Sequence, residues 1–189
     1  MERIDISVLM AVYKKDNPAF LRESLESIFS QTVEAAEVVL LEDGPLTEAL
    51  YDVIKSFVSR YPTLKVVSYP ENRGLGKTLN DGLLLCKYDI VARMDADDIC
   101  KPNRLEVEYN WLQAHEDYDV IGSWIDEFTD DKTQVKSIRK VPEKYDEIQK
   151  YAQYRCPINH PTAMYRKAAV LAVGGYLAEY FPEDYFLWL

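Results

Sequence analysis

The chain has 189 residues, of which 48% are hydrophobic and 29% are charged, a balance typical of a globular protein with one substantial core. Its 22 basic and 32 acidic residues give a net charge of −10, which argues against nucleic acid or an anionic membrane surface as the main partner. We expect neither a signal peptide nor a transmembrane segment, because no long apolar run is present. Three widely spaced cysteines favour reduced thiols and a cytoplasmic location.

Apolar runs and amphipathic stretches alternate along the first 115 residues. The predicted strands are short apolar runs rich in Ile and Val, at residues 4–12, 36–43, 64–69 and 89–95. The predicted helices have apolar residues at helical spacing, at residues 18–31, 46–60, 75–86 and 104–115. Asn17 and Pro18 are typical of an N-cap followed by the first residue of a helix. This alternation predicts an α/β fold with a mostly parallel sheet flanked by helices on both faces.

The second part of the chain has a looser pattern. Residues 118–128 are predicted as one further strand. Residues 134–141 alternate like an exposed strand, which suits an antiparallel sheet edge or a hairpin with residues 118–128. No linker, internal repeat or low-complexity tract divides the chain. We therefore expect a single domain over residues 1–189 with a small antiparallel or mixed C-terminal part.

The stretch ENRGLGKTLNDGL, residues 71–83, contains Gly-Lys-Thr and resembles the end of a phosphate-binding P-loop. The full pattern needs a first glycine where this chain has Glu71, and Pro70 interrupts the strand that should lead into the loop. The sequence therefore argues against a P-loop nucleotide hydrolase. Lys77 is expected to be a solvated helix residue and not a phosphate ligand.

Acidic residues follow the predicted strands at their carboxyl ends, where open α/β sheets bind ligands. Glu42 and Asp43 end the second strand, and Asp95, Asp97 and Asp98 follow the fourth. Helix capping explains any one of these acids but explains poorly three carboxylates within four residues. Clustered carboxylates repel one another unless a cation compensates them, so the pattern predicts a divalent metal that bridges Asp95 and Asp97 to a diphosphate.

Several further stretches are distinctive as an ordered set: ISVLMAVYKKDNPAFLRESLESIFSQT, LLEDGP, NRGLGKTLNDGL, ARMDADDICKPNRL, CPINHPTAMYRKAAVLAVGGY and PEDYFLWL. Together they resemble the inverting family 2 glycosyltransferases of the GT-A fold, and more narrowly the bacterial enzymes that build capsule, exopolysaccharide or O-antigen. The resemblance implies transfer of a sugar from a nucleotide diphosphate sugar, expected to be a UDP-sugar, to a hydroxyl of a glycan or lipid-linked acceptor. It also implies inversion and Mg²⁺ or Mn²⁺ as cofactor.

The resemblance assigns roles to single residues. Asp97 would be the metal ligand, and Asp184 would be the base that deprotonates the acceptor hydroxyl. The nucleotide would be bound by Ala11, Val12, Tyr13, Asp43, Arg73 and Asp95. In this set the first three line the base pocket, partly through backbone atoms, Asp43 bonds the base, and Asp95 contacts the ribose or the metal shell. The acceptor-side assignments are Asn159, His160 and Glu183.

Three of these assignments have alternatives. Arg73 could contact the nucleotide or form a salt bridge with Glu42, Asp43 or Asp95. His160 could be structural, as lone histidines often are. The Pro-Glu-Asp sequence that contains Asp184 could simply open a helix with acids in its first turn.

Neighbouring residues are expected to support the site. Gly74 and Gly76 would permit a tight turn before the helix that begins at residue 75. The leucines expected to pack this helix onto the sheet are Leu79, Leu83 and Leu84. Arg93 would balance the acidic cluster, and Asp98 would cap the following segment or support the site.

The chain also departs from the family pattern. Phe186 stands where relatives often have another Asp, and no Gln-x-x-Arg-Trp sequence is present, which disfavours a processive synthase. Because the sequence stops at Leu189 within a predicted helix, we expect a truncated acceptor side. In this interpretation residues 1–100 bind the nucleotide sugar and residues 101–189 form the acceptor-side part. Peripheral membrane association through residues beyond this sequence is compatible with that view.

Two other functions remain as alternatives. A sugar-phosphate nucleotidyltransferase would need a glycine-rich basic loop near the N-terminus, and AVYKKDNP has lysines but no glycine. A non-catalytic nucleotide- or glycan-binding module would not need both Asp97 and Asp184.

Overall fold

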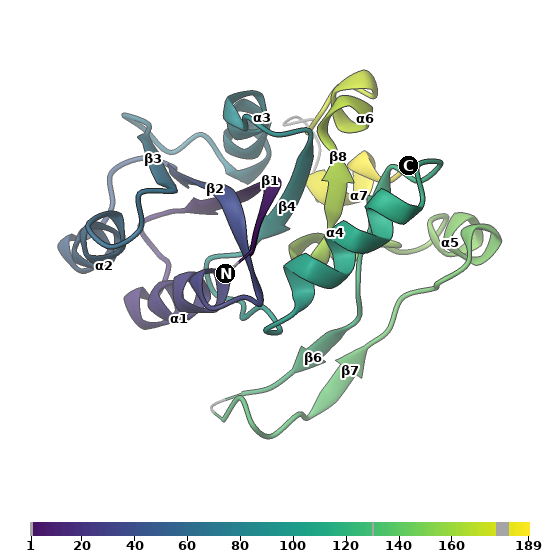
Figure 1. The fold of residues 1–189 in the computed structure, drawn as a ribbon, viewed down its shortest axis with the longest axis horizontal. Coiled ribbons are helices and arrows are strands. Elements are labelled where there is room, and N and C mark those ends of the chain that lie inside the picture. The colour runs from purple at the N-terminus through teal and green to yellow at the C-terminus, as the bar shows by residue number, and fades with distance from the viewer. Residues whose placement is uncertain (1, 130, 177–181) are drawn as a thin grey trace.

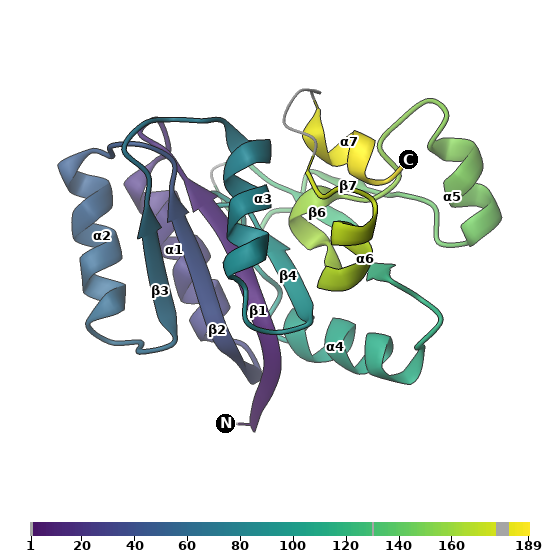
Figure 2. The same ribbon diagram turned by 90° about the horizontal axis from the view of Figure 1, so that it is seen from above.

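The computed structural model describes residues 2–129, 131–176 and 182–189, and its centre is a six-stranded sheet with the order β3-β2-β1-β4-β8-β5 (Figures 1 and 2). The four parallel strands are β1 (Glu2–Val12), β2 (Val33–Glu42), β3 (Leu64–Ser68) and β4 (Ile90–Met94). Two short strands extend the sheet in antiparallel fashion: β8 (Met164–Arg166) beside β4, and β5 (Val120–Ile121) beside β8. The predicted α/β fold is confirmed.

Helices cover both faces of this sheet (Figure 2). One face carries α1 (Pro18–Phe29), α2 (Glu48–Val58) and α4 (Arg104–Ala114). The other face carries α3 (Leu75–Leu85), α6 (Lys167–Ala172) and α7 (Glu183–Leu187). A further helix, α5 (Tyr145–Tyr151), lies to the side of the sheet (Figure 1). The start of α1 is local in origin, because the Asn17 side chain accepts the Ala19 N–H as predicted.

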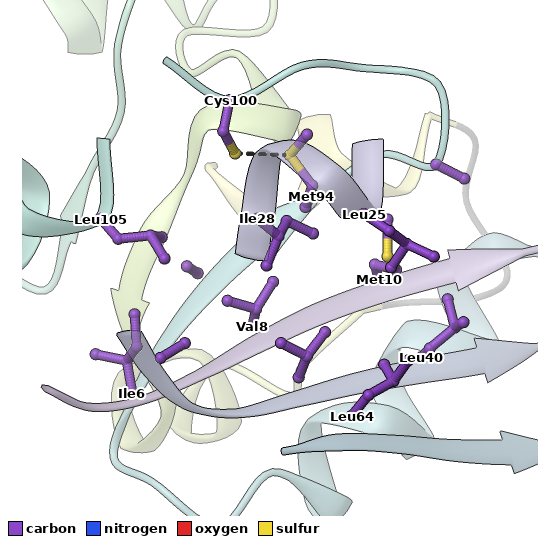
Figure 3. Packing of buried hydrophobic residues seen from close by; sticks show 14 of the residues in the cluster. Ile6, Val8, Met10, Leu25, Ile28, Leu40, Leu64, Met94, Cys100 and Leu105 are labelled. Atoms are coloured by element: carbon purple, nitrogen blue, oxygen red, sulfur yellow. Dashed lines mark hydrogen bonds between the residues drawn. The ribbon is translucent and has the colours of Figure 1, made fainter. Parts of the chain in front are cut away.

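Alternation along the strands divides the core between the two faces. Val8 and Met10 of β1 point toward α1, where they pack with Leu25 and Ile28 (Figure 3). Leu9, between them in the sequence, joins the cluster under α3 on the opposite face. Both faces of β2 and β4 are buried, so these strands have continuous apolar runs, whereas the edge strand β3 has exposed Lys65 and Ser68.

Helix α3 packs closely against the sheet. Two expectations about this helix, for Gly76 and for Leu84, are wrong. A Cβ atom at Gly82 would clash with the side chains of Leu9 and Leu41. Gly74 has the expected left-handed backbone, with φ of +86°, but Gly76 lies inside the helix without positive φ and does not make the turn. Leu79 and Leu83 are fully buried as predicted, whereas Leu84 is 62% exposed because it lies on the opposite side of α3.

The single strand predicted over residues 118–128 is wrong. The chain forms β5 and then a separate strand, β6 (Ile125–Glu127), which pairs with β7 (Ser137–Arg139) in a small antiparallel sheet. The hairpin part of the prediction is thereby confirmed. The break falls at Gly122 and Ser123, because Thr162 Oγ1 accepts the Ser123 N–H at 2.9 Å and Asn159 Nδ2 donates to the Ser123 carbonyl at 2.9 Å. These side chains bond to the Ser123 N–H and carbonyl, which a continuous strand would have used to pair with its neighbour.

None of the helices in the described ranges has the length and apolar character needed to cross a membrane.

Candidate active site

The strand order places a ligand-binding edge between β1 and β4. In the sheet, β1 has β2 on one side and β4 on the other, so the order of the parallel strands reverses at β1. Ligands of open α/β sheets bind at the carboxyl ends of the strands at such a switch point. The loop after β4 contains Asp95, Asp97 and Asp98, and one carboxylate oxygen of each lies within 4.8 Å of the others. Oxygen donors in this number suit Mg²⁺ or Mn²⁺.

The acids of this cluster destabilise one another's charged forms. Burial, and then the charges of Asp95 and Asp97, raise the pKa of Asp98 to about 6. Asp97 is exposed and forms no hydrogen bond or ion pair within the described part of the chain, so its carboxylate is free to bind a cation. A divalent cation here would relieve the repulsion, which is the physical reason the residues fit a metal.

A fourth acid, Asp16, faces the cluster from the loop after β1, and the sequence analysis missed it. Burial raises the pKa of Asp16, and the nearby charges of Asp97 and Asp95 raise it further. Its Oδ2 accepts the Tyr13 N–H at 2.9 Å, which holds the loop in place. The sequence signal that could have identified Asp16 is its position in the loop after β1, a strand that flanks the switch point.

Arg93 balances the cluster from below, as predicted. Its guanidinium is only 1% exposed, and Nη1 lies 2.5 Å from Asp95 Oδ1. The Asp95 carbonyl accepts the Ser24 hydroxyl at 2.8 Å, so side chain and backbone of Asp95 are both anchored. The cluster therefore has a buried positive charge directly beside Asp95.

Asp43 is held entirely by the protein. Its Oδ1 accepts the Arg73 N–H at 2.7 Å and the Thr78 hydroxyl at 2.9 Å. Its Oδ2 accepts from Asn72 Nδ2 at 2.9 Å and from the Gly74 N–H at 3.1 Å. A carboxylate has about four acceptor positions, so these bonds occupy most of its capacity. Asp43 ties β2 to the start of α3, and its predicted contact with a base remains a prediction.

The expected salt-bridge partners of Arg73 are wrong. Arg73 Nη1 lies 2.8 Å from Asp81 Oδ2, and its guanidinium stacks 3.6 Å from the Tyr69 ring centroid. The Arg73 N–H is fixed by Asp43, which directs the side chain along α3 toward Asp81. Arg73 Nε and Nη2 are buried and have no hydrogen-bond partner in the described part of the chain, so the nucleotide contact remains a prediction.

The end of β1 offers a ligand mainly backbone groups and the Tyr13 ring. Val12 is 1% exposed in the core, and its carbonyl accepts the Asp43 N–H at 2.8 Å. Ala11 is partly buried against the cluster under α3. Tyr13, at 39% exposure, is the side chain of this segment that a ligand can reach.

The predicted base, Asp184, lies at the start of α7 and is half-buried. The Cys156 thiol donates to Asp184 Oδ2, with 3.4 Å between sulfur and oxygen. Burial and the Asp184 charge raise the pKa of Cys156 to about 12, so the thiol keeps its proton and remains a donor at neutral pH. Its neighbour Glu183 is buried. The short helix α7 thus has the two acids in its first turn, and the role of Asp184 as base remains a prediction.

Asn159 and His160 are buried and bonded internally. His160 Nε2 lies 3.1 Å from the Tyr176 hydroxyl, which in turn lies 3.2 Å from the Tyr165 hydroxyl. Burial, and secondarily the charge of Arg93, lower the pKa of His160 well below its usual range, so the ring is neutral at pH 7. Asn159 holds the segment before β6, as described above. Their acceptor-side role remains a prediction.

Tyr176 connects the two sides of the site. Burial is the main reason that the pKa of Tyr176 is raised to about 12. The charges of Asp184 and Glu183 also raise this pKa, whereas the Tyr165 hydroxyl and Arg93 lower it. The hydroxyl therefore lies within electrostatic reach both of the arginine under the acidic cluster and of the acids on α7. The fold brings the β4 loop and the start of α7 to a common region, although they are about ninety residues apart in the sequence.

Comparison with known proteins agrees with this geometry. A family model described as Glycosyl transferase family 2 matches residues 7–174. An uncharacterized glycosyltransferase of Haemophilus influenzae is 48% identical over 97% of this chain and 67% of its own length. The UDP-Gal:alpha-D-GlcNAc-diphosphoundecaprenol beta-1,3-galactosyltransferase of Escherichia coli is 43% identical over 97% of this chain and 66% of its own length. The chain thus spans about two thirds of the length of these curated relatives.

Solved structures resemble the fold at lower identity. Staphylococcus aureus TarS 1-349 in complex with UDP has a TM-score of 0.75 at 20% identity, and the match covers 98% of this chain and 54% of that one. The mannosyltransferase PcManGT of Pyrobaculum calidifontis, in complex with GDP-Man and Mn²⁺, has a TM-score of 0.71 at 17% identity over 96% of this chain and 50% of that one. These neighbours are GT-A glycosyltransferases, which identifies the fold. The chain belongs to glycosyl transferase family 2 and has the GT-A fold.

Proposed function

We propose that this chain transfers a sugar from a nucleotide diphosphate sugar to a hydroxyl of a glycan or lipid-linked acceptor, with inversion and with a divalent metal. The observation that carries the proposal is the cluster of Asp95, Asp97 and Asp98 at the switch point of the sheet. Uridine diphosphate is the proposed nucleotide, because the E. coli relative is named for UDP-Gal. A role in bacterial cell-surface polysaccharide synthesis is supported by the same relative and by the amylovoran biosynthesis glycosyltransferase AmsE of Erwinia amylovora, which is 38% identical over 97% of this chain and 68% of its own length.

The residues divide the chemistry between two elements. Asp97, which is exposed, and Asp95 would hold the cation and thereby the diphosphate. When bound, the cation supplies positive charge that offsets the charge on the departing diphosphate. Asp184 takes the proton from the attacking hydroxyl. Since the base and the metal ligands are different carboxylates on different elements, a single displacement suffices, and this inverts the anomeric centre.

The same proposal assigns the two parts of the chain. Residues 1–100 contain the acidic cluster and the loops after β1, β2 and β3, and they bind the donor. Residues 101–189 contribute Asp184 and the acceptor side. A lipid-linked acceptor would place the protein at the cytoplasmic face of a membrane. A sugar-phosphate nucleotidyltransferase finds no support in the family to which the chain belongs.

The metal-dependent donor site is tested by thermal unfolding with UDP, with and without Mg²⁺. At about 100 times its dissociation constant, UDP with Mg²⁺ should add roughly 2.7 kcal/mol of stability. Excess chelator should abolish the gain. In the variant Asp97→Ala the gain should also disappear, whereas the control Lys77→Ala should keep it. Equal stabilisation by UDP in chelator would contradict the metal bridge.

A non-catalytic binding module would pass that test, so a second measurement separates it. A glycosyltransferase should release UDP from UDP-galactose slowly in water and faster with a saccharide acceptor. A binding module should hold the nucleotide sugar without turnover under both conditions.

A further inference from the structure

A cavity of about 770 Å³ lies beside the acidic cluster and plays no part in the mechanism above. Its walls come from α1, from the loop that joins β4 to α4, from α4 and from the β6–β7 hairpin. Asp98 lines this cavity and is also a member of the metal cluster, so the two spaces share a wall. The volume falls within the range of about 300–1,000 Å³ that is usual for small-molecule sites.

The hairpin that closes the cavity is fixed at two points. Lys101 Nζ lies 2.5 Å from Asp126 Oδ2, and Lys132 Nζ lies 3.2 Å from Glu23 Oε2. Trp124, on the hairpin side of the cavity, donates its indole N–H to the Val141 carbonyl at 3.0 Å. These contacts join the hairpin to α1 and to the β4–α4 loop, and they hold the indole in place. Lys140 Nζ lies 4.5 Å from the centroid of the Trp124 ring and covers one of its faces, while 43% of Trp124 remains exposed.

The charges in the cavity restrict what it can hold. Five acids line it, and three of them form ion pairs: Glu23 with Lys132, Asp126 with Lys101, and Glu108 with Arg104. The other two, Glu26 and Asp98, have no ion-pair partner among the described residues. The excess negative charge disfavours a diphosphate or an anionic lipid headgroup. Carboxylates and an exposed indole instead suit a neutral ligand with many hydroxyl groups and one apolar ring face.

We propose that this cavity is an acceptor subsite that binds a neutral sugar unit of the acceptor glycan, with Trp124 under the sugar ring and Asp98 and Glu26 accepting its hydroxyls. The inference rests on the proposed transferase function and deepens it. The short 3-10 helix η1 (His160–Thr162) supports this placement, because Pro161 and Thr162 line the cavity while His160 contacts Tyr176 on the side of Asp184. One turn of chain thus joins the wall of the cavity to Tyr176, whose hydroxyl lies within electrostatic reach of Asp184.

The three tryptophans of the chain provide a direct readout, because each indole N–H gives its own NMR signal. The probes are methyl α-N-acetylglucosaminide and methyl α-galactoside, each added to protein with and without UDP and Mg²⁺. We expect a saturable shift of the Trp124 signal, and no shift of Trp111, which is stacked on His115 at 4.2 Å. No shift of Trp124 at about 100 mM of either probe would overturn the proposal, because a dissociation constant above that concentration is too weak for specific binding of an acceptor.

A pair of matched variants tests the cavity itself. Val107→Phe fills space in the cavity wall, and Val58→Phe makes the same change at an exposed position of α2 that does not line it. Val107→Phe should weaken the saccharide-dependent shift at least about tenfold, because added volume displaces the ligand, while UDP–Mg²⁺ binding stays normal. Val58→Phe should change neither. Equal saccharide binding in both variants would overturn the subsite.

The outcomes for the subsite and for the proposed function are separable. If the unmodified protein does not bind UDP with Mg²⁺, the donor site is refuted. A saccharide-dependent shift of the Trp124 NMR signal in the same sample would still support the subsite. Normal UDP–Mg²⁺ binding without any saccharide shift would refute the subsite alone.

Discussion

The loops after β2 and β4 both carry carboxylates at the same edge of the sheet, but the protein uses them differently. After β2, Asp43 is 5% exposed and accepts hydrogen bonds from the loop before α3 and from Thr78. After β4, Asp97 is exposed and bonds to nothing in the described chain. One acid is held by the protein's own donors, and the other has a free carboxylate, to which we propose that a cation binds.

The difference shows how position in the strand order decides the role of an acid. Asp43 lies beside the start of α3, where unpaired backbone N–H groups need acceptors. Asp97 lies at the switch point with Asp16, Asp95 and Asp98, where negative charges accumulate without enough partners. Acids of the first kind should matter for folding, and acids of the second kind should matter for binding and catalysis.

The largest expected effect tests whether Asp184 belongs with the functional acids. Asp184→Asn keeps the size of the side chain and removes its basic character, so transfer should fall about 10²–10⁴-fold. Donor binding should survive, because the metal ligands are unchanged. The measurement combines UDP release with a synthetic N-acetylglucosaminyl diphosphate lipid and calorimetric titration with UDP and Mg²⁺. Transfer at the normal rate would show that the base is elsewhere, and loss of donor binding would make Asp184 a structural residue.

The second prediction addresses the comparison directly. Asp43→Ala leaves several buried donors unpaired and should lower the free energy of unfolding by about 2–4 kcal/mol. Asp97→Ala should change it by less than about 0.5 kcal/mol in the absence of metal, since an exposed and unbonded acid is removed. Urea unfolding of both variants without nucleotide provides the measurement. A similar loss of stability in both would remove the distinction between the two loops.

A third prediction concerns Glu108, which combines burial with incomplete bonding. Its Oε2 accepts from Arg104 Nε at 3.0 Å, its Oε1 has no partner in the described chain, and burial raises its pKa to about 7. A carboxyl whose pKa is raised by folding favours the folded state when protonated, so its contribution is lost as pH rises from about 4.5 to 7.

Replacing this group should therefore flatten the pH dependence of stability. Between pH 5 and 7.5 the unmodified protein should lose on the order of 1–3 kcal/mol relative to Glu108→Gln, because the glutamine has no proton to release. Urea unfolding at a series of pH values compares the two proteins. Parallel stability curves would show that the Arg104 pair keeps Glu108 ionised in the folded state.

The smallest expected effect is that of Lys77→Ala. Lys77 is exposed on α3 and has no ion pair in the described chain, and the loop before it is held by Asp43 instead of by a phosphate. UDP–Mg²⁺ binding should stay within about twofold of normal, as for other surface substitutions. Loss of nucleotide binding, measured by calorimetry, would revive the P-loop hypothesis.

Local sequence determined much of this protein. The alternation of apolar runs and helical spacing was enough to predict β1 to β4 and α1 to α4, because these patterns are local, and α1 and α2 also have side-chain N-caps in Asn17 and Thr47. The acidic cluster was also predictable, since Asp95, Asp97 and Asp98 are close in the chain. The pairing of Arg93 with Asp95 has the same local origin.

Tertiary structure decided what depends on distant partners. The break in residues 118–128 comes from Asn159 and Thr162, which bond to Ser123 from nearly forty positions further along the chain. Arg73 pairs with Asp81 and not with the predicted acids, while its backbone N–H donates to Asp43, thirty positions earlier in the chain. Long-range contacts of this kind leave no periodic trace in the sequence.

The same limit applies to the site. Asp16 faces the acidic cluster only because β1 and β4 are neighbours in the sheet, although Ile90 is more than eighty residues from Ile6, its partner in register. The cavity under the hairpin has walls from segments far apart in the chain, and the ion pairs Lys101–Asp126 and Lys132–Glu23 connect these segments. Sequence alone determined which chemical groups this chain has at its strand ends, and the strand order of the folded sheet decided which of them meet.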